Sequence, residues 1–443
     1  MKPHSLLSHR DPRRIAFVEG ATGRSTTWGD IEGYARSIEA PGPLGLIIDD
    51  PIEMARCFLG ALAAGITVAP LSPSATDAEL RQQIDALGLA AVCRDGGVTV
   101  VGGGRPVDAA LLLSSSGTTG RPKVIPLTEQ QLFTTAQSIA VHHLIGPADC
   151  GYSPLPLSHI NGLVVGLLTT LVAGSTMVLD RKLSASTFWD TAGRYGITWL
   201  NLVPAMITIL ANREPPPPEV TRGIRFVRSA SAPLPVEVLE RFEARCGVGV
   251  LETYGMTEAA SQITANPLEP SARRPGSVGR PVEIDLTIVD DAGDEVAPGV
   301  VGEVVIEGRG VRRLRTGDVG RLDEDGFLYL LARADDVINR GGEKVYPAEI
   351  EAILLADPEV TAAVVVGRRH AIIGEEPVAY VLADVSVVER TGLAERLARR
   401  CARSLSAYKR PAEITVTETL PTGPTGKVRR IEVRRRVAQE TMS

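Results

Sequence analysis

The sequence has few aromatic residues, few cysteines and no long uninterrupted apolar run. Aromatic side chains make up only 4% of the 443 residues, so the composition supports no inference about an aromatic-lined pocket. The five cysteines show no CxxC spacing and no neighbouring histidine cluster, which argues against a zinc site and indicates buried thiols in a reducing compartment. The most apolar stretch, 163–179, is interrupted by glycine, serine and threonine, and the N-terminus lacks an apolar segment. We therefore expect a cytoplasmic protein without membrane association.

An excess of charge of one sign is also missing. The chain carries 47 basic and 53 acidic residues, a net charge of -6, and its arginine-rich segment 429–436 is offset by acidic residues elsewhere. No broad basic surface is expected, which argues against nucleic acid as a partner. The hydrophobic fraction of 44% is typical of a globular protein. Because 443 residues exceed what one compact core usually holds, we expect a large domain, a smaller one and a cleft between them.

Short apolar runs alternate with helical periodicity through the first part of the chain. The strands that this pattern predicts are 45–48, 66–70, 176–179 and 199–203, and the helices are 52–64, 187–195 and 236–246. Such alternation favours an α/β domain of parallel-rich sheets covered by helices. The four prolines at 215–218 cannot continue a helix and predict a surface loop within this domain.

The pattern changes after residue 280. Short strands separated by turn residues, at 285–289, 302–306 and 327–331, predict a small β-rich subdomain. From residue 349 a helix, strands at 362–366 and 377–382, a helix at 393–405 and a last strand predict a compact α+β module. We place the boundary near Asp335, which gives an N-terminal domain 1–334 and a C-terminal domain 335–443.

A segment built to hold phosphate follows an apolar strand. The residues 111–123, LLLSSSGTTGRPK, combine glycines that can turn backbone N–H groups toward an anion, hydroxyls that can donate to it and one lysine. A Walker loop is excluded, since Gly117, Gly120 and Lys123 are each separated by only two residues. The alternative interpretation is a flexible surface loop.

Four further motifs follow in a fixed order: YGMTE at 254–258, RTGD at 315–318, RADDVINRGG at 333–342 and PTGK at 424–427. Together with the phosphate segment they resemble the adenylate-forming superfamily, which includes acyl-CoA synthetases, firefly-type luciferases and the adenylation domains of peptide synthetases. The likeness covers about residues 25–432, although the region before the phosphate segment is shorter than is usual in that family.

The resemblance implies that this protein activates a carboxylic acid with ATP and passes the acyl group to the thiol of coenzyme A. It implies an ATP and Mg²⁺ site, with Tyr254 at adenine, Thr257 at the α-phosphate and Glu258 holding the metal. Asp318 and Arg333 would contact ribose. The other nucleotide-binding residues that it implies are Ser115, Ser116, Gly117, Thr118, Thr119, Gly120, Lys123, Ser231, Ala232, Pro233, Gly255 and Met256.

The C-terminal motif implies the catalytic lysine, Lys427. A cation there would stabilise the charge that develops when a carboxylate attacks the α-phosphorus. The resemblance also implies rotation of the small domain about Asp335 between two half-reactions, which would bring Gly341, Gly342 and Lys344 to the thiol. The segment 156–162 resembles the acyl-side motif, with His159 near the substrate carboxylate; a packing histidine is the alternative.

The choice of acid is only partly constrained. No aspartate lies in 154–166 to hold an α-ammonium group, which argues against an amino-acid substrate. Val124, Arg315 and Ala332 depart from the usual family residues without removing a catalytic group. The strings at 266–268, 275–279 and 338–344 are most similar to small-acid ligases of the oxalyl-CoA synthetase type.

Two alternatives to a coenzyme A ligase stay open: loading of an acyl carrier protein, and nucleotide binding without catalysis. Monomer and homodimer are both compatible with the sequence.

Overall fold

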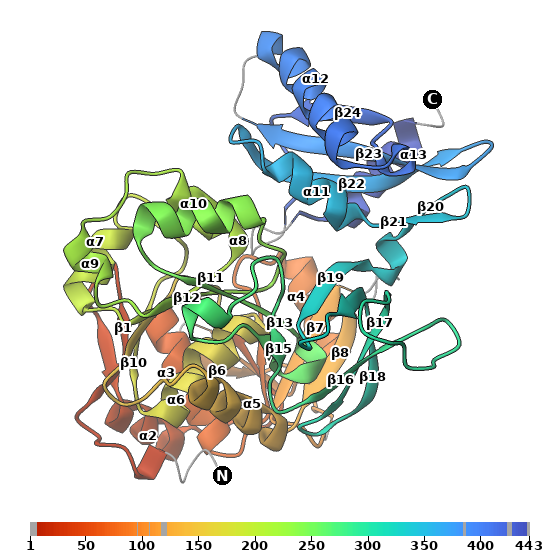
Figure 1. Cartoon of the computed structure of the whole chain (residues 1–443). Coiled ribbons are helices and arrows are strands. Elements are labelled where there is room, and N and C mark those ends of the chain that lie inside the picture. The colour runs from red at the N-terminus through yellow and green to blue at the C-terminus, as the bar shows by residue number, and fades with distance from the viewer. Residues whose placement is uncertain are drawn as a thin grey trace.

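The computed structural model describes residues 7–94, 96–105, 107–116, 122–383, 387–422 and 428–440. It contains a large N-terminal domain and a small C-terminal domain, drawn in blue in Figure 1. The large domain holds two mixed sheets covered by helices and a third, antiparallel sheet. The expected α/β fold class is confirmed.

The larger sheet has nine strands, whose inner pairs are parallel and whose edges are antiparallel. Parallel strands end at one common edge, which is where open α/β sheets bind ligands. In spatial order the strands are β15 (Arg280–Pro281), β14 (Ser261–Ala265), β13 (Val250–Met256), β12 (Phe226–Ser229), β11 (Trp199–Leu202), β9 (Cys150–Ser153), β10 (Thr176–Leu179), β1 (Ile15–Glu19) and β2 (Ser25–Thr27).

The second sheet has six strands and carries the phosphate segment. Its strand β7 runs parallel to β4 and then pairs antiparallel with β8, so that the segment 117–121 connects two neighbouring strands. In spatial order the strands are β6 (Gly97–Val100), β5 (Ala91–Arg94), β3 (Leu44–Ile47), β4 (Val68–Pro70), β7 (Leu111–Ser116) and β8 (Pro122–Leu127).

Four helices of the large domain begin at a side-chain N-cap. Thr27, Thr76 and Thr128 each form a capping box with the residue three positions later. Asp50 caps a further helix that has proline at its first position. The helices are α2 (Trp28–Ser37), α3 (Pro51–Ala63), α4 (Asp77–Leu87), α5 (Glu129–His142), the π-helix η1 (Asn161–Leu168), α6 (Thr169–Ala173), α7 (Phe188–Tyr195), α8 (Pro204–Ala211), α9 (Pro218–Thr221) and α10 (Val236–Cys246).

Two buried clusters hold the nine-stranded sheet in place. One joins α3, α5 and η1 to strands of both mixed sheets, and the other packs α7, α8 and α10 against the nine-stranded sheet. The sheet is therefore covered on both faces, which fits its near-continuous apolar strands. No described helix combines the length and the apolar character needed to cross a bilayer.

The β-rich subdomain is a four-stranded antiparallel sheet of β16 (Asp285–Val289), β17 (Gly302–Gly308), β18 (Val311–Leu322) and β19 (Leu328–Arg333). It packs on the end of β13 and on β14 through a separate apolar cluster. Short 3-10 turns, η2 (Thr257–Ala259) and η3 (Pro270–Ala272), lie on the chain that leads to it.

The small domain forms one sheet with helices against it, and α11 contacts both β19 and α10 of the large domain. This matches the expected α+β module. Its elements are η4 (Ala334–Asp336), β20 (Ile338–Arg340), β21 (Glu343–Val345), α11 (Pro347–Leu355), β22 (Val360–His370), β23 (Gly374–Ala383), α12 (Val387–Ser404), η5 (Ala407–Lys409), β24 (Glu413–Thr417) and α13 (Arg430–Glu440).

Two features differ from the sequence expectation. The proline run is a loop only as far as Pro217, since Pro218 is the first residue of α9. Proline is tolerated there because the N–H group that it lacks would have no partner within the helix. The basic segment near the C-terminus is the helix α13, whose Val433 and Val437 are buried against β22 and β23. These two valines are four positions apart, so they lie on one face of a helix that is otherwise rich in arginine.

Candidate active site

Tyr254, Asp318 and Arg333 form the best-connected group of predicted site residues. Asp318 and Arg333 are directly paired residues of β18 and β19, and Tyr254 reaches them from β13. The Tyr254 hydroxyl donates to Asp318 Oδ2 at 2.5 Å, and Arg333 Nη1 lies 3.1 Å from Asp318 Oδ1. Burial and then the Asp318 charge raise the pKa of the Tyr254 phenol. The group offers a fixed carboxylate and a half-exposed guanidinium, which suits recognition of vicinal hydroxyls.

Lys123 and Glu258 meet although 135 positions separate them. Lys123 lies on β8 and Glu258 in η2, and Nζ is 3.1 Å from Oε1. Gly255 makes the approach of β14 possible, because a Cβ there would lie 1.8 Å from the Ser261 carbonyl oxygen. A lysine beside a carboxylate at strand ends can bind phosphate and a hard cation together.

Protein side chains near Lys123 and Glu258 supply only part of the predicted metal site. Within the described ranges, no three His, Cys, Asp or Glu side chains gather to hold a metal ion. Mg²⁺ usually takes one or two carboxylates and completes its shell with water and substrate phosphates. Glu258 beside Lys123 fits that pattern as a single carboxylate ligand.

Ser231 and the acyl-side motif lie against each other. Ser231 adopts a left-handed conformation with φ of 77°, and its Oγ accepts a bond from Asn161 Nδ2 at 3.4 Å. Asn161 is the first residue of η1, and π-helical turns of this kind are frequent at functional sites. Ala232 and Pro233 follow Ser231 directly on the loop after β12.

His159 lies in the turn before η1. Burial lowers the pKa of its imidazole, which is therefore neutral at neutral pH. Its Nε2 atom is buried and has no hydrogen-bond partner among the described residues. A buried ring nitrogen of this kind fits a contact with a polar substrate group.

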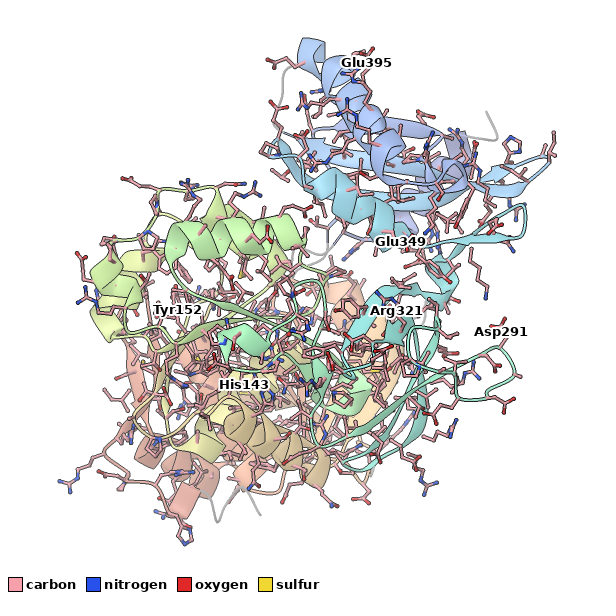
Figure 2. All side chains as sticks on the ribbon, in the orientation of Figure 1. His143, Tyr152, Asp291, Arg321, Glu349 and Glu395 are labelled. Carbon is pink, nitrogen blue, oxygen red and sulfur yellow. The ribbon has the colours of Figure 1, made fainter. Side chains whose placement is uncertain are left out.

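The small domain carries Gly341, Gly342 and Lys344 on the β20–β21 hairpin. Both glycines have positive φ, 62° and 93°, and the Gly342 amide donates to Asn339 Oδ1 at 3.0 Å. Lys344 Nζ lies 3.5 Å from Asp291 Oδ2 of the large domain. Figure 2 shows Asp291 on the exposed loop between β16 and β17.

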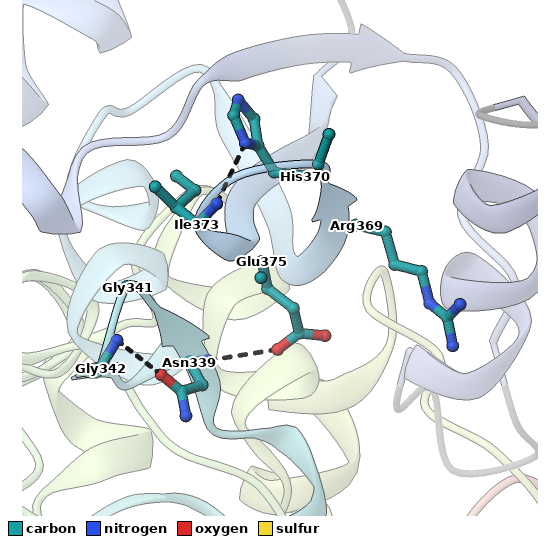
Figure 3. Close-up of a pocket in the computed structure, with 9 residues that line it drawn as sticks. Asn339, Gly341, Gly342, Arg369, His370, Ile373 and Glu375 are labelled. Carbon is teal, nitrogen blue, oxygen red and sulfur yellow. Dashed lines mark hydrogen bonds between the residues drawn. The ribbon is translucent and has the colours of Figure 1, made fainter.

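A pocket of about 760 Å³ opens beside this hairpin. Figure 3 shows the pocket with three hydrogen bonds, of which one joins Asn339 of β20 to Glu375 of β23, while the others join Gly342 to Asn339 and Ile373 to His370. It belongs to the small domain and lies apart from the Tyr254–Asp318–Arg333 group. Its lining residues are Asn339, Gly341, Gly342, Arg369, His370, Ala371, Ile373, Gly374 and Glu375.

Asp335, the predicted hinge, lies in η4 between the two domains and contacts the last helix. Arg434 Nη2 donates to the Asp335 carbonyl at 2.7 Å and lies 2.8 Å from Asp336 Oδ1. Arg430 Nε lies 3.3 Å from Asp336 Oδ2. The helix that follows the Lys427 motif is thus tied to the hinge segment.

Several predicted residues cannot be placed. Gly117, Thr118, Thr119, Gly120 and Lys427 lie outside the described residues. Ser115 and Ser116 end β7, where the backbone alone is described. Met256 ends β13, and Thr257 begins η2 next to Glu258.

Sequence reasoning missed a buried polar cluster around Arg228 on β12. Its guanidinium donates to Asn161, Asn201 and Gln262, each from a different element. The signal that could have found it is one arginine after two apolar residues in a short strand, and such an arginine could equally have faced solvent.

The family models agree with the motifs. One described as AMP-binding enzyme matches residues 99–313, and one described as AMP-binding enzyme C-terminal domain matches residues 349–427.

Curated relatives and solved structures extend this agreement. The chain is 41% identical over 349 residues to a sulfoacetate–CoA ligase of Cupriavidus necator, and 37% identical over 349 residues to an oxalate–CoA ligase of Arabidopsis thaliana. These matches cover 74% and 73% of this chain and 67% of each relative, about two thirds of their length. The o-succinylbenzoate coenzyme A synthetase of Bacillus subtilis, solved with ATP and magnesium, is similar with a TM-score of 0.83 and 26% identity over 98% of this chain and 99% of that one.

The expected superfamily is thereby confirmed. The chain belongs to the AMP-binding enzymes and, within them, to the acid–CoA ligases that activate a carboxylic acid through an acyl-adenylate.

Proposed function

We propose that this enzyme activates a small carboxylic acid that carries a second acidic group and transfers the acyl group to the thiol of coenzyme A. The observation that carries the proposal is that Tyr254 of the Asp318 group and Glu258 of the Lys123–Glu258 pair lie on one short stretch of chain, in β13 and in the turn η2 that follows it. The acid is suggested by two relatives that are named for sulfoacetate and oxalate, each of which carries two acidic groups.

Each nucleotide-binding residue has a role that its chemistry supports. Asp318 accepts hydrogen bonds from the ribose hydroxyls, and Arg333 adds a second ribose contact. Tyr254 and the segment 231–233 line the adenine pocket. Thr257 and Lys123 contact phosphate, together with the phosphate segment 115–120. Glu258 holds Mg²⁺, which when bound neutralises phosphate charge.

The acyl side depends on His159 and the small domain. The neutral His159 imidazole, in the tautomer that is protonated at Nε2, donates one hydrogen bond to the substrate carboxylate. Lys427 stabilises the charge that develops as that carboxylate attacks the α-phosphorus of ATP, with pyrophosphate as the leaving group. The thiolate of coenzyme A then attacks the carbonyl carbon of the acyl-adenylate, the C–S bond of the thioester forms, and AMP leaves.

The two half-reactions need two positions of the small domain. We place the boundary between residues 334 and 335, with Asp335 as the hinge. Rotation there replaces Lys427 at the site by the β20–β21 hairpin with Gly341, Gly342 and Lys344. The exposed Lys344–Asp291 pair is weak enough to break during this motion. We place the reaction in the cytoplasm, since all five cysteines are free thiols.

The test is pyrophosphate release from ATP and Mg²⁺ across a panel of carboxylic acids, with and without coenzyme A. Sustained release that requires coenzyme A, and that is lost in Lys427→Ala, is the expected result. Release that stops after one turnover with coenzyme A would instead identify a carrier protein as the acceptor. No release with any acid would contradict the proposed function.

A further inference from the structure

Arg228 is a charged residue enclosed by neutral partners. It is 2% exposed, at the next-to-last position of β12. Nε and Nη2 each donate to Gln262 Oε1 at 3.3 Å, and Nη1 donates to Asn161 Oδ1 and Asn201 Oδ1, also at 3.3 Å. All four bonds are long compared with the 2.7–2.9 Å that is typical of a guanidinium on a carboxylate.

No acidic side chain pairs with Arg228 in the described part of the chain. The loop segments 117–121 and 423–427 contain no Asp or Glu in the sequence. A buried charge without a counter-ion is strongly unfavourable, because desolvation is compensated only by dipoles. Burial accordingly lowers the pKa of the guanidinium to about 9. The desolvation of the Arg228 charge is therefore not offset by any acidic side chain among the described residues.

Hydrogen-bond donors are also left over in this cluster. The four bonds occupy four of the five guanidinium N–H groups of Arg228. Gln262 is completely buried, and its Nε2 has no partner among the described residues. Two neighbouring donors, one of them cationic, fit an anionic acceptor.

The cluster lies directly behind the acyl side of the site. Asn161 accepts from Arg228 and donates to Ser231, so one side chain separates the guanidinium from the predicted adenine loop. Asn161 is two residues from His159, which we place at the reacting carboxylate. Asn161 therefore links the proposed acyl side of the site to Arg228.

We propose that Arg228, with Gln262, binds the second acidic group of the acyl substrate, a carboxylate or sulfonate, and makes the enzyme select short doubly charged acids over monoacids. This inference rests on the proposed function and assigns its selectivity to one buried side chain. The bound anion supplies the counter-charge that Arg228 lacks among the described residues.

The test compares kcat/KM for oxalate, malonate and sulfoacetate with that for acetate and propionate, by pyrophosphate release. Wild type should prefer the doubly charged acids, and Arg228→Gln should reduce that preference about 10- to 100-fold, the range for hydrogen bonds to charged groups. Arg228→Lys should restore part of it. Equal losses for both classes of acid would show that Arg228 only supports the fold.

Gln262→Glu is the second variant, and it keeps the side-chain shape while giving Arg228 a carboxylate of its own. It should fold, reduce the preference for doubly charged acids and leave the variant more resistant to heat. An undiminished preference would overturn the proposal. Thermal unfolding with each acid reads binding without turnover. Stabilisation of wild type by doubly charged acids without pyrophosphate release would support the anion site while contradicting the proposed function.

Discussion

The two halves of the proposed site are built in different ways. In the large domain, Asp318 is 8% exposed and is held by Tyr254 and Arg333 from two other strands. In the small domain, Lys344 lies 3.5 Å from Asp291 of the large domain, whose side chain is 98% exposed. The buried half is fixed before substrate arrives, because its side chains hold one another. Water and salt weaken the contact between Lys344 and Asp291, as the proposed rotation of the small domain requires.

The largest expected effect on the reaction rate comes from a residue of the small domain. Lys427→Ala should slow adenylation about 10²- to 10³-fold, the scale for one electrostatic donor at a developing charge. Transfer to coenzyme A from a supplied acyl-adenylate should change far less. Single-turnover measurements of both half-reactions check this. Arg429→Ala, which removes an exposed ion pair with Glu432, is the matched control. Equal losses in both half-reactions would break the comparison.

The next effect is in the buried half. Asp318→Asn removes the charge that Tyr254 and Arg333 share, so the KM for ATP should rise about 10- to 100-fold, as for lost hydrogen bonds to a charged group. Initial rates against ATP concentration measure it. Asp325→Asn, on the exposed turn before β19, serves as control. A variant that binds ATP normally would remove Asp318 from the nucleotide site.

A smaller effect is expected from restricting the hinge. Asp335→Pro fixes φ at one value and should hinder rotation of the small domain. A barrier raised by about 1.4 kcal/mol slows overall acyl-CoA formation tenfold. The first burst of pyrophosphate should persist. Rapid-quench measurement of the burst and the steady state separates the two. Loss of the burst would mean that Asp335 serves adenylation instead.

The smallest effect concerns the exposed contact itself. Asp291→Asn removes the partner of Lys344, and an exposed pair is worth about 0–1 kcal/mol, so steady-state turnover should change less than about fivefold. The salt dependence of turnover should become flatter, because one screened attraction is gone. Asp285→Asn, at the start of β16, is a comparable neutralisation elsewhere on that sheet. A tenfold effect would show that the contact is stronger than its exposure indicates.

The sequence predicted the fold class and most elements because they follow local rules. Apolar periodicity acts over a few residues, so the sequence predicts α10 and the strand β16 with their observed bounds. The site motifs were recognised through resemblance. Their convergence, such as Tyr254 on Asp318 64 positions later, depends on strand order, which local patterns do not specify.

The Arg228 cluster could not be predicted for a related reason. Its members come from η1, β11, β12 and β14, and each is a single polar residue in an apolar segment. Only the assembled sheet shows that they face one another. The π-helical geometry of η1 could not be predicted either, because its residues are as apolar as those of an ordinary buried α-helix.

Because η1 is a π-helix, the geometry of the site should depend on the exact number of residues in this segment. A π-turn holds more residues than an α-turn, and in an α-helix one residue corresponds to about 100° of rotation. Deleting one residue between 162 and 168 would let the segment close as an α-helix that stays apolar and buried. The same deletion would turn Asn161 away from Arg228 and Ser231. A one-codon deletion here should therefore disable the site in a protein that still folds, whereas the exposed glycines at 102 and 103 should tolerate the same change in length.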